Sequence, residues 1–470
     1  MFTFKKGAPE DYGIPSSAVA KMEEMYAKLG VRMHGYMLIS GDTVLAERYW
    51  HPFDENTQHR MYSVTKSFVA VAIGLLEKQG LIKVTDKICD YFPEKLPKDG
   101  PHPWIAEMTI EDMLTMCTCH GSTTYKRYDS PDWTASFFYV EPDHIPGTVF
   151  SYDTSSSHVL AALVEKLTGM KMLDYMRKEI LDELGFSKEA YIIADPVGVS
   201  QGGSGMMSTL RDVACVAYLC NQYGVIEGKE IISPDYMRKA TSNQVPTDLQ
   251  PKLDEQCGYG YFIWMPREEG FVFFGMGGQL AVCFPKYDFI YMTMADVISS
   301  PAGVQLIMDA FYNTVYPYLA ERSEKNPLAF EEDRECFDNN ATHNRTYYFY
   351  PNKLKWRSLT FDWEAGLLKF TVSEDEYFLK FGSEVSEVQT FLNTGYKCEC
   401  KGYWNKGHFF IDTYLVDEEQ GNVRMDFAWK DKRLSVRSVC TNDPFVNNPA
   451  LKKSFDGFAS AECQDFYSCN

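Results

Sequence analysis

The feature that most constrains this chain is an apolar run at residues 66–79, KSFVAVAIGLLEKQ, which ends at Gly80. Apolar residues lie on almost every side of a helix built from this run. A helix without a polar face is buried inside a protein rather than lying on its surface. Glycine directly after such a run is a common helix end. The sequence therefore predicts a buried helix over 66–79.

Several other segments carry recognisable periodicity. Helical spacing of apolar residues predicts helices at 16–29, 155–168 and 209–222. Two apolar runs that flank Gly41-Asp42 predict a β-hairpin. The apolar runs within 271–296 predict adjacent strands of one sheet.

The character of the chain changes near residues 323–340, which are polar and charged. Beyond them, segments of strand length alternate with turns rich in Gly, Asp, Glu and Lys, a pattern typical of antiparallel strands. A length of 470 residues suits two domains. We therefore predict a first domain at 1–325 and an all-β domain at 326–470.

Composition excludes some classes of function. The chain has 65 acidic and 46 basic residues, a net charge of −19, which disfavours binding to nucleic acid or to anionic membranes. The first residues lack the apolar core of a signal peptide, and no stretch reaches the length of a membrane helix. The 13 cysteines are an odd number without a framework spacing. These observations predict a cytoplasmic protein with free thiols.

Ser63-Val64-Thr65-Lys66 lies at the start of the predicted buried helix. Serine needs a base within hydrogen-bond reach to become a nucleophile, and a lysine three residues later lies one turn along the same helix face. Burial and the positive end of the helix dipole both disfavour a charged lysine, so Lys66 can serve as that base. The helix start also leaves the amide of Ser63 free to bind an oxyanion. The alternative is a capping serine beside a surface lysine, because a Ser-x-x-Lys arises by chance about once in such a chain.

A series of segments, taken in order, resembles the β-lactamase-like serine hydrolases, a family that includes class C β-lactamases, DD-peptidases, carboxylesterases and nylon-oligomer hydrolases. The resemblance runs from about residue 12 to residue 318. It implies an α/β fold with an antiparallel sheet flanked by helices, a helical lobe and a cleft between them. The segments are 62–68 (YSVTKSF), 80–82 (GLI), 109–116 (TIEDMLTM), 146–152 (PGTVFSY), 167–169 (LTG), 203–209 (GSGMMST), 258–261 (GYGY) and 275–279 (GMGGQ).

By this resemblance Tyr152 is the second-motif tyrosine, whose phenol would lie near Ser63 and relay a proton to the leaving group. The alternative is an aromatic packing residue after a turn. The motif is usually Tyr-x-Asn, whereas Thr154 stands here in place of asparagine. The resemblance also implies that Tyr62 and Thr154 contribute to substrate binding.

Met276-Gly277-Gly278 takes the place of the third motif, Lys-Thr-Gly or His-x-Gly in relatives. The glycines would let a substrate backbone approach, and the resemblance implies that the amide of Gln279 is the second oxyanion donor. The alternative is a glycine bulge in a strand. Methionine cannot bind the carboxylate of a β-lactam or D-Ala peptide as a cation does. Met276 therefore favours a neutral ester or amide substrate.

Three hypotheses remain at this stage: a serine esterase or amidase that works through Ser63, Lys66 and Tyr152, a β-lactamase or DD-peptidase, and a non-catalytic sensor that kept the fold. The expected partner is a small ester or amide, and no cofactor is expected. Cys117-Thr118-Cys119-His120 lacks further ligands at supporting spacing, so no metal site is predicted. The C-terminal β domain resembles accessory domains behind such hydrolases, which leaves two roles open: covering the cleft, or self-association into a homo-oligomer.

Overall fold

The computed structural model describes residues 2–300, 302–323, 345–383, 388–417, 420–442, 445–446 and 448–463. These residues build two hydrophobic cores, one extending from Ile14 to Leu319 and the other from Tyr347 to Cys463. The predicted domain boundary at 325/326 lies outside the described residues and stays a prediction. No helix in the described ranges is both long and apolar enough to cross a bilayer.

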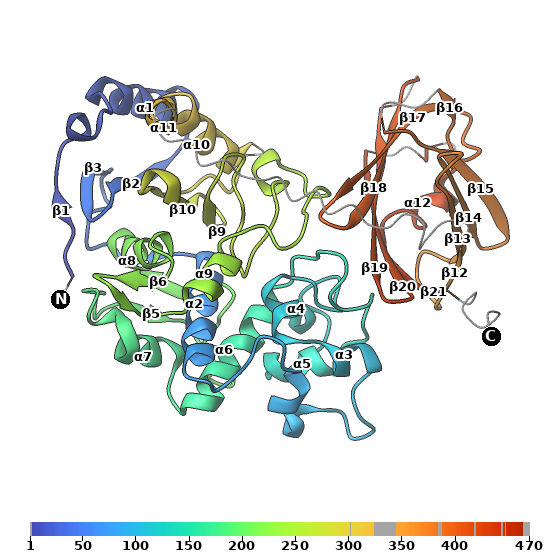
Figure 1. The fold of residues 1–470 in the computed structure, drawn as a ribbon, viewed down its shortest axis with the longest axis horizontal. Helices are drawn as coiled ribbons and strands as arrows, with labels where there is room; N and C mark the ends of the chain where they lie inside the picture. Colours follow the sequence, from blue (N-terminus) through green and yellow to red (C-terminus); the bar gives the residue numbers. More distant parts are fainter. Residues whose placement is uncertain are drawn as a thin grey trace.

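A six-stranded sheet forms the centre of the N-terminal part, residues 2–323 (Figure 1). Its strand order is β1-β3-β2-β11-β10-β9, and every pair is antiparallel except β1 with β3. The hairpin predicted at Gly41-Asp42 is the connection between β2 and β3, and the strands predicted within 271–296 are β9, β10 and β11. The strands are β1 (Lys5–Lys6), β2 (Met33–Ser40), β3 (Thr43–Tyr49), β9 (Phe271–Gly275), β10 (Gln279–Phe284) and β11 (Phe289–Ala295).

Helices cover both faces of this sheet (Figure 1). Those on one face are α1 (Ser16–Lys28), α10 (Gly303–Tyr312) and α11 (Tyr316–Ser323), and those on the other are α2 (Val64–Lys78), α8 (Leu210–Asn221) and α9 (Pro234–Ala240). Helix α2 corresponds to the predicted buried helix, and all of its residues except the last two are buried. Its apolar sequence explains its place between the sheet and the helical lobe, where no side of it faces water.

The helical lobe packs beside α2. It consists of α3 (Pro103–Glu107), α4 (Ile110–Leu114), α5 (Trp133–Tyr139), α6 (Thr154–Thr168) and α7 (Met172–Met176). A three-stranded sheet, β4-β6-β5, joins the lobe to the start of α2. Its strands are β4 (His59–Arg60), β5 (Tyr191–Ile192) and β6 (Met206–Ser208), and a separate hairpin is formed by β7 (Val225–Ile226) and β8 (Lys229–Glu230).

The C-terminal β domain, residues 345–463, is one antiparallel sheet of ten strands in the order β15-β14-β13-β12-β21-β20-β19-β18-β17-β16. A bridge between Gly382 and Lys401 brings the two ends of this sheet together, so that the sheet curls into a near-barrel. The elements are β12 (Thr346–Phe349), β13 (Trp356–Asp362), β14 (Leu367–Val372), β15 (Asp375–Lys380), β16 (Gln389–Thr390), β17 (Lys397–Asn405), β18 (His408–Leu415), β19 (Asn422–Lys430), β20 (Arg433–Thr441), β21 (Gly457–Cys463) and α12 (Pro449–Lys452).

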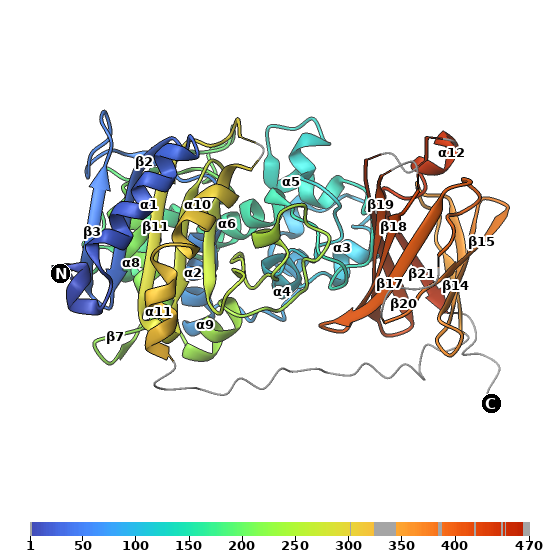
Figure 2. The same ribbon diagram turned by 90° about the horizontal axis from the view of Figure 1, so that it is seen from above.

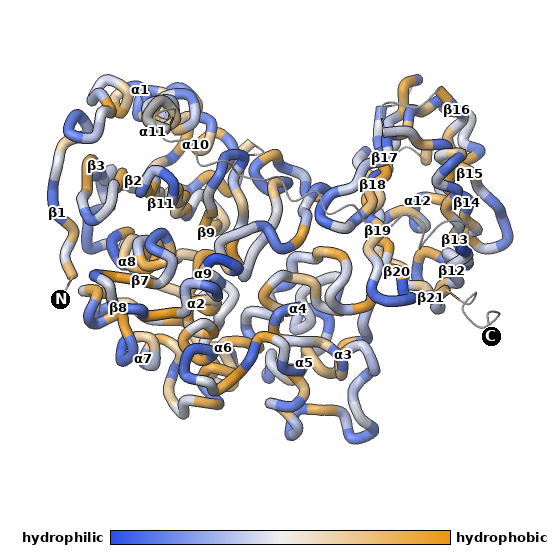
Figure 3. Tube along the Cα trace, viewed as in Figure 1, coloured by the Kyte–Doolittle hydropathy of each residue, from blue (hydrophilic) through white to orange (hydrophobic). Residues whose placement is uncertain are grey.

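Buried and exposed residues alternate along β13, β14 and β15, so every second side chain points into the interior of the near-barrel. Hydrophobic residues follow the inner elements of both parts of the molecule (Figure 3). The near-barrel lies against the helical lobe on the side of α3 and α4 (Figure 2). The structure confirms the predicted fold class, an α/β part followed by an all-β domain.

The aromatic core of the near-barrel gives a first prediction. Phe361 is fully buried and stacks on Trp363 at 4.6 Å. We expect Phe361→Ala to lower the free energy of unfolding by about 3–5 kcal/mol, because it removes buried apolar surface and leaves a cavity. Phe378→Ala on β15 is the matched control. The Phe378 ring is 49% exposed, so the change should stay within about 0.5 kcal/mol. Urea unfolding followed by circular dichroism measures both, and equal losses would contradict the described packing.

Candidate active site

Ser63 occupies the N-cap position of α2, at the end of a tightly held turn. The amide of Met61 donates to the carbonyl of Met206. The Thr65 hydroxyl donates to the carbonyl of Tyr62 at 2.6 Å and accepts from the amide of Met206 at 3.0 Å. Tyr62 has a φ of 47°, a conformation that is costly for a side chain of its size. Strand β6 and the first turn of α2 together hold this conformation, which fixes the direction of the Ser63 side chain.

Lys66 points from the first turn of α2 back towards Ser63. Its Nζ lies 3.1 Å from Ser63 Oγ and donates to the carbonyl of Gly203 at 2.7 Å. Only 1% of Lys66 is exposed. Burial lowers the pKa of Lys66 from 10.5 to about 7, while the negative charge of Asp153 acts weakly in the opposite direction. Near neutral pH this amine therefore exists in both protonation states.

The carbonyl of Gly203, which accepts the hydrogen bond from Lys66, belongs to a loop that packs against α6. A side chain at Gly203 would collide with Thr154, so glycine is required for this approach. Thr154 presents its methyl group to this loop, and its backbone amide donates to the hydroxyl of Thr123 at 3.4 Å. Thr154, predicted to bind substrate, is thus placed next to the Lys66 pocket and is partly buried.

Tyr152 lies on the other side of Lys66, just before α6. The Lys66 Nζ is 4.9 Å from the centre of the Tyr152 ring. The ring stacks on Trp264 at 5.6 Å and meets Tyr259 edge-on at 6.3 Å. Burial raises the pKa of Tyr152 above its ordinary value, and a hydrogen bond with Ser63 opposes that shift. The structure thus brings Ser63, Lys66 and Tyr152, which are distant in the sequence, into one cluster.

Asp153 is a member of this cluster that the sequence analysis did not single out. Its Oδ1 caps α6 by accepting from the amide of Ser155 at 2.8 Å, while its buried Oδ2 has no hydrogen-bond partner within the described residues. Burial raises the pKa of Asp153 to about 6, against the effects of Ser155 and Lys66. An Asp before a helix is so common as a cap that the sequence carried no signal of its proximity to Lys66.

The glycine turn at 276–278 connects β9 to β10. Gly277 and Gly278 have φ values of 87° and 97°. The side chain of Gln279 is 1% exposed. Its Nε2 donates to the carbonyls of Met276 at 3.1 Å and Ala295 at 2.8 Å, and its Oε1 accepts from the amide of Ala295 at 3.2 Å. The side chain of Gln279 is therefore committed to holding the turn. The predicted role of its backbone amide as an oxyanion donor stays a prediction.

Gly275, the last residue of β9, is another residue that the sequence analysis did not weigh. A side chain at this position would collide with the carbonyl of Met61, two residues before Ser63. The edge strand β9 therefore runs directly along the turn that carries Ser63, and Met276 follows at its end with a half-exposed side chain. A glycine inside a strand is a signal of close backbone approach, but the sequence does not say what approaches.

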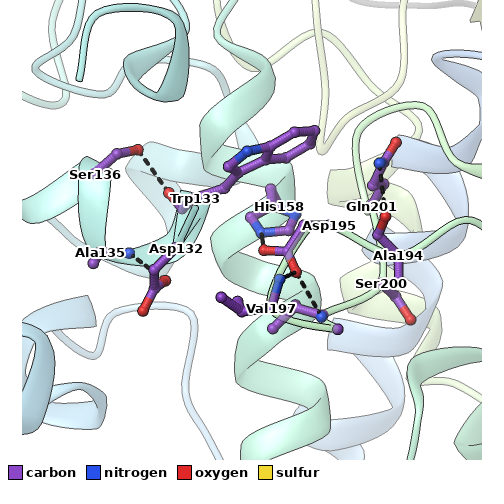
Figure 4. A network of polar contacts seen from close by, with 12 residues as sticks. Asp132, Trp133, Ala135, Ser136, His158, Ala194, Asp195, Val197, Ser200 and Gln201 are labelled. Carbon is purple, nitrogen blue, oxygen red and sulfur yellow. Dashed lines mark hydrogen bonds and ion pairs between the residues drawn. The ribbon is translucent and has the colours of Figure 1, made fainter. Parts of the chain in front are cut away.

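His158 lies on α6 and takes part in a different network (Figure 4). Its Nε2 lies 3.2 Å from Asp195 Oδ2. Asp195 Oδ1 in turn accepts from the amides of Val197 at 3.0 Å and Val199 at 2.8 Å, and the Trp133 ring lies 5.5 Å from that of His158. The pair ties the 195–199 turn to α6. Across the described ranges, His, Cys, Asp and Glu form no group of three or more that could hold a metal ion.

The sequence model of the Beta-lactamase family matches residues 18–300, more than half of the chain. Over 217 residues the chain is 25% identical to a 6-aminohexanoate-dimer hydrolase of Paenarthrobacter ureafaciens. That match covers 43% of this chain and 55% of the relative, so the chain spans about half the length of this curated protein.

Two solved structures show the same fold at low sequence identity. A penicillin-binding protein homologue from Caulobacter crescentus superposes with a TM-score of 0.53 at 16% identity, over 65% of this chain and 98% of that one. The structure of SurE superposes with a TM-score of 0.54 at 16% identity, over 90% of this chain and 95% of that one. The similarity to SurE thus extends into the C-terminal β domain.

The buried position of Lys66 gives a prediction about stability. The folded-state pKa of about 7 lies below the usual 10.5, so between these values the unfolded chain binds a proton that the folded chain does not. The free-energy cost of burying Lys66 is greatest below about pH 7, and it decreases as the pH rises from about 7 towards 10.5. We expect Lys66→Met to stabilise the protein more at pH 6 than at pH 9, by about 2–3 kcal/mol.

Urea unfolding of wild type and variant at the two pH values measures this difference. Lys66→Met changes the packing equally at both pH values, so this contribution cancels when its effects on the free energy of unfolding at the two pH values are subtracted. Lys78→Met, at the exposed end of the same helix, is the matched control and should show no such dependence. A pH-independent effect of Lys66→Met would mean that Lys66 stays charged in the folded protein.

Proposed function

Since this chain belongs to the Beta-lactamase family, we propose that it is a serine hydrolase that cleaves a small carboxylic ester or amide through an acyl-enzyme on Ser63. One observation carries the proposal: the Lys66 Nζ lies 3.1 Å from Ser63 Oγ in a buried site that lowers the pKa of the amine to about 7. A base with a pKa near the working pH is the most effective proton acceptor for a serine nucleophile. The name of its relative, a 6-aminohexanoate-dimer hydrolase, supports the same reaction class.

In the proposed mechanism, neutral Lys66 takes the proton of Ser63 as Oγ attacks the substrate carbonyl. The phenol of Tyr152, next to both groups, then passes a proton to the leaving oxygen or nitrogen. Water attacks the acyl-enzyme with the same groups in reversed roles, and the acid product leaves. Burial of Tyr152 keeps its phenol protonated, which suits a group that donates a proton.

The negative charge on the tetrahedral oxygen requires two donors. The amide of Ser63 is the first, since it precedes the helical bonds that begin with the amides of the following residues. For the second, the resemblance names the amide of Gln279. The close approach of Gly275 to Met61 supports the amide of Met276 instead, because that amide directly follows the point of contact.

The rim of the site supports a neutral, partly apolar substrate. Met276 and Ile298 have 50% and 55% of their surface exposed, and both border the turn at Gly277. Neither side chain can pair with a carboxylate, which a β-lactam or D-Ala peptide would present. We therefore place an ester or amide with an uncharged acyl group ahead of β-lactams.

Removing the nucleophile tests the proposal directly. We expect Ser63→Ala to lower the turnover of p-nitrophenyl butyrate by about 10³-fold or more, since no acyl-enzyme can form. Ser67→Ala is the matched control. It removes a buried hydroxyl one turn along the same helix, where Ser67 donates to the carbonyl of Phe262 at 3.2 Å, and it should keep nearly the full rate. Equal rates for wild type and Ser63→Ala would overturn the proposal.

The lowered pKa of Lys66 predicts a pH profile. The neutral amine is the active form, so kcat/KM should fall about tenfold for each pH unit below roughly 7 and level off above it. Measuring p-nitrophenyl butyrate hydrolysis from pH 5 to pH 9 checks this, with correction for spontaneous hydrolysis. A profile that is flat down to pH 5 would exclude Lys66 as the base.

Two further assays separate the remaining hypotheses. Nitrocefin turnover faster than ester turnover would favour a β-lactamase. Failure of a fluorophosphonate probe to label Ser63 would favour a non-catalytic binding protein, because an inert serine does not react with it.

A further inference from the structure

The family match ends at residue 300, yet the C-terminal β domain touches the segment that leads into Tyr152. Three neighbouring strands, β19, β20 and β21, face residues 143–150 (Figure 1). The Arg437 guanidinium on β20 donates to the carbonyl of Phe150 at 2.6 Å. The Lys430 ammonium on β19 donates to the carbonyl of Pro146 at 2.9 Å. The hydroxyl of Ser460 on β21 accepts from the amide of Ile145 at 3.2 Å.

A ring of the C-terminal β domain adds an apolar contact to these hydrogen bonds. Phe458 on β21 stacks on His144 at 4.6 Å, and Arg437 covers the Phe458 ring at 5.8 Å. A side chain at Gly121 would collide with this ring. Phe458 thus fills a space between two loops of the helical lobe, so the two parts of the molecule interlock at this point.

Arg437 carries its charge in a largely buried place. Burial lowers the pKa of Arg437, and the carboxylates of Asp426 and Asp456 oppose this. Asp426 lies opposite Arg437 in the pairing of β19 with β20. A charged guanidinium that donates from a buried place forms a stronger hydrogen bond than a neutral or exposed donor does. The contact with the carbonyl of Phe150 is therefore much firmer than a bond between exposed groups would be.

The position of Phe150 links this contact to the active site. Phe150 is buried against Tyr259 at 5.1 Å and Trp264 at 5.7 Å, the same two rings that pack on Tyr152. Only Ser151 separates Phe150 from Tyr152. A shift of the backbone at Phe150 would consequently move both the phenol and its aromatic support.

The loop on the other side of Tyr152 is held by the same domain. Asp248 accepts from the Tyr403 hydroxyl at 3.2 Å and from the Asn405 amide at 2.8 Å, and its carbonyl accepts from Arg424 at 2.7 Å. A bridge between Val245 and Tyr259 connects this loop to the ring that meets Tyr152 edge-on.

We propose that the C-terminal β domain completes the active site by positioning Tyr152, with Arg437 as the main positioning residue. Arg437 touches no reacting atom in this scheme. It fixes the backbone at Phe150, and thereby the distance of the phenol from Ser63 and Lys66. The inference rests on the proposed role of Tyr152 in hydrolysis, and it assigns the domain a part in catalysis rather than a separate binding task.

The test compares two arginines of one strand. Arg437→Met removes the bond to Phe150, whereas Arg433→Met removes a contact of the same domain with Glu107 on α3, at 2.7 Å, away from Tyr152. For p-nitrophenyl butyrate we expect Arg437→Met to lower kcat by about 10- to 100-fold with little change in KM, because misplacement affects proton transfer more than binding. Arg437→Lys should recover part of the loss, and Arg433→Met should stay near wild type.

Hydrogen exchange followed by mass spectrometry gives a second readout that needs no activity. Peptides covering 143–152 should exchange faster in Arg437→Met than in Arg433→Met. Equal kcat losses in the two variants, or equal exchange, would overturn the inference. A wild type without ester turnover would instead defeat the proposed function, while the exchange comparison would still test the contact. If Arg437→Met fails to fold, Lys430→Met, which removes the bond to Pro146, replaces it with the same expected outcomes.

Discussion

The site depends on the burial of the Lys66 amine between the sheet and α6. This burial is energetically unfavourable for the charged form of the amine. Water would hold the proton on this amine, and burial against the Tyr152 ring and the Gly203 carbonyl removes that water. The carbonyl of Gly203 and the Ser63 hydroxyl give the nitrogen only neutral partners, so the charged form gains little compensation. The Ser-x-x-Lys spacing alone does not lower the pKa of Lys66. The tertiary structure around it does.

Several features of the fold and of the site could be predicted from the sequence, because they depend on residues that are close together in the chain. The apolar run of α2, the hairpin at Gly41-Asp42 and the strand alternation of the near-barrel each report burial through periodicity. Ser63 and Lys66 are neighbours by helix geometry, so their pairing follows from spacing. Tyr152 was reached only through resemblance, because nothing between residues 66 and 152 tells which aromatic ring packs against the amine.

The features that sequence reasoning did not find all depend on contacts between distant segments. In the sequence, Asp153 is an ordinary helix cap. Its charge acts on Lys66 only because α6 packs against α2. In the sequence, Gly275 is only a glycine that interrupts a strand. Its structural role is to allow the close approach of the Met61 carbonyl. The contact of Arg437 also could not be predicted from the sequence. Arg437 binds the carbonyl of Phe150 because of the way the near-barrel packs against the helical lobe, and no periodicity in the sequence encodes that packing.

The Gly203 carbonyl has a consequence for the neutral form of Lys66. A carbonyl oxygen only accepts, so it binds one N–H of the amine at 2.7 Å whatever the protonation state. Once the proton is lost, this fixed N–H leaves two tetrahedral positions on the nitrogen for the second N–H and the lone pair, and the Ser63 oxygen lies 3.1 Å from the nitrogen. In the proposed mechanism the lone pair would take the position that faces the Ser63 hydroxyl, so a backbone carbonyl with no acid–base chemistry of its own would help to set the direction of proton transfer.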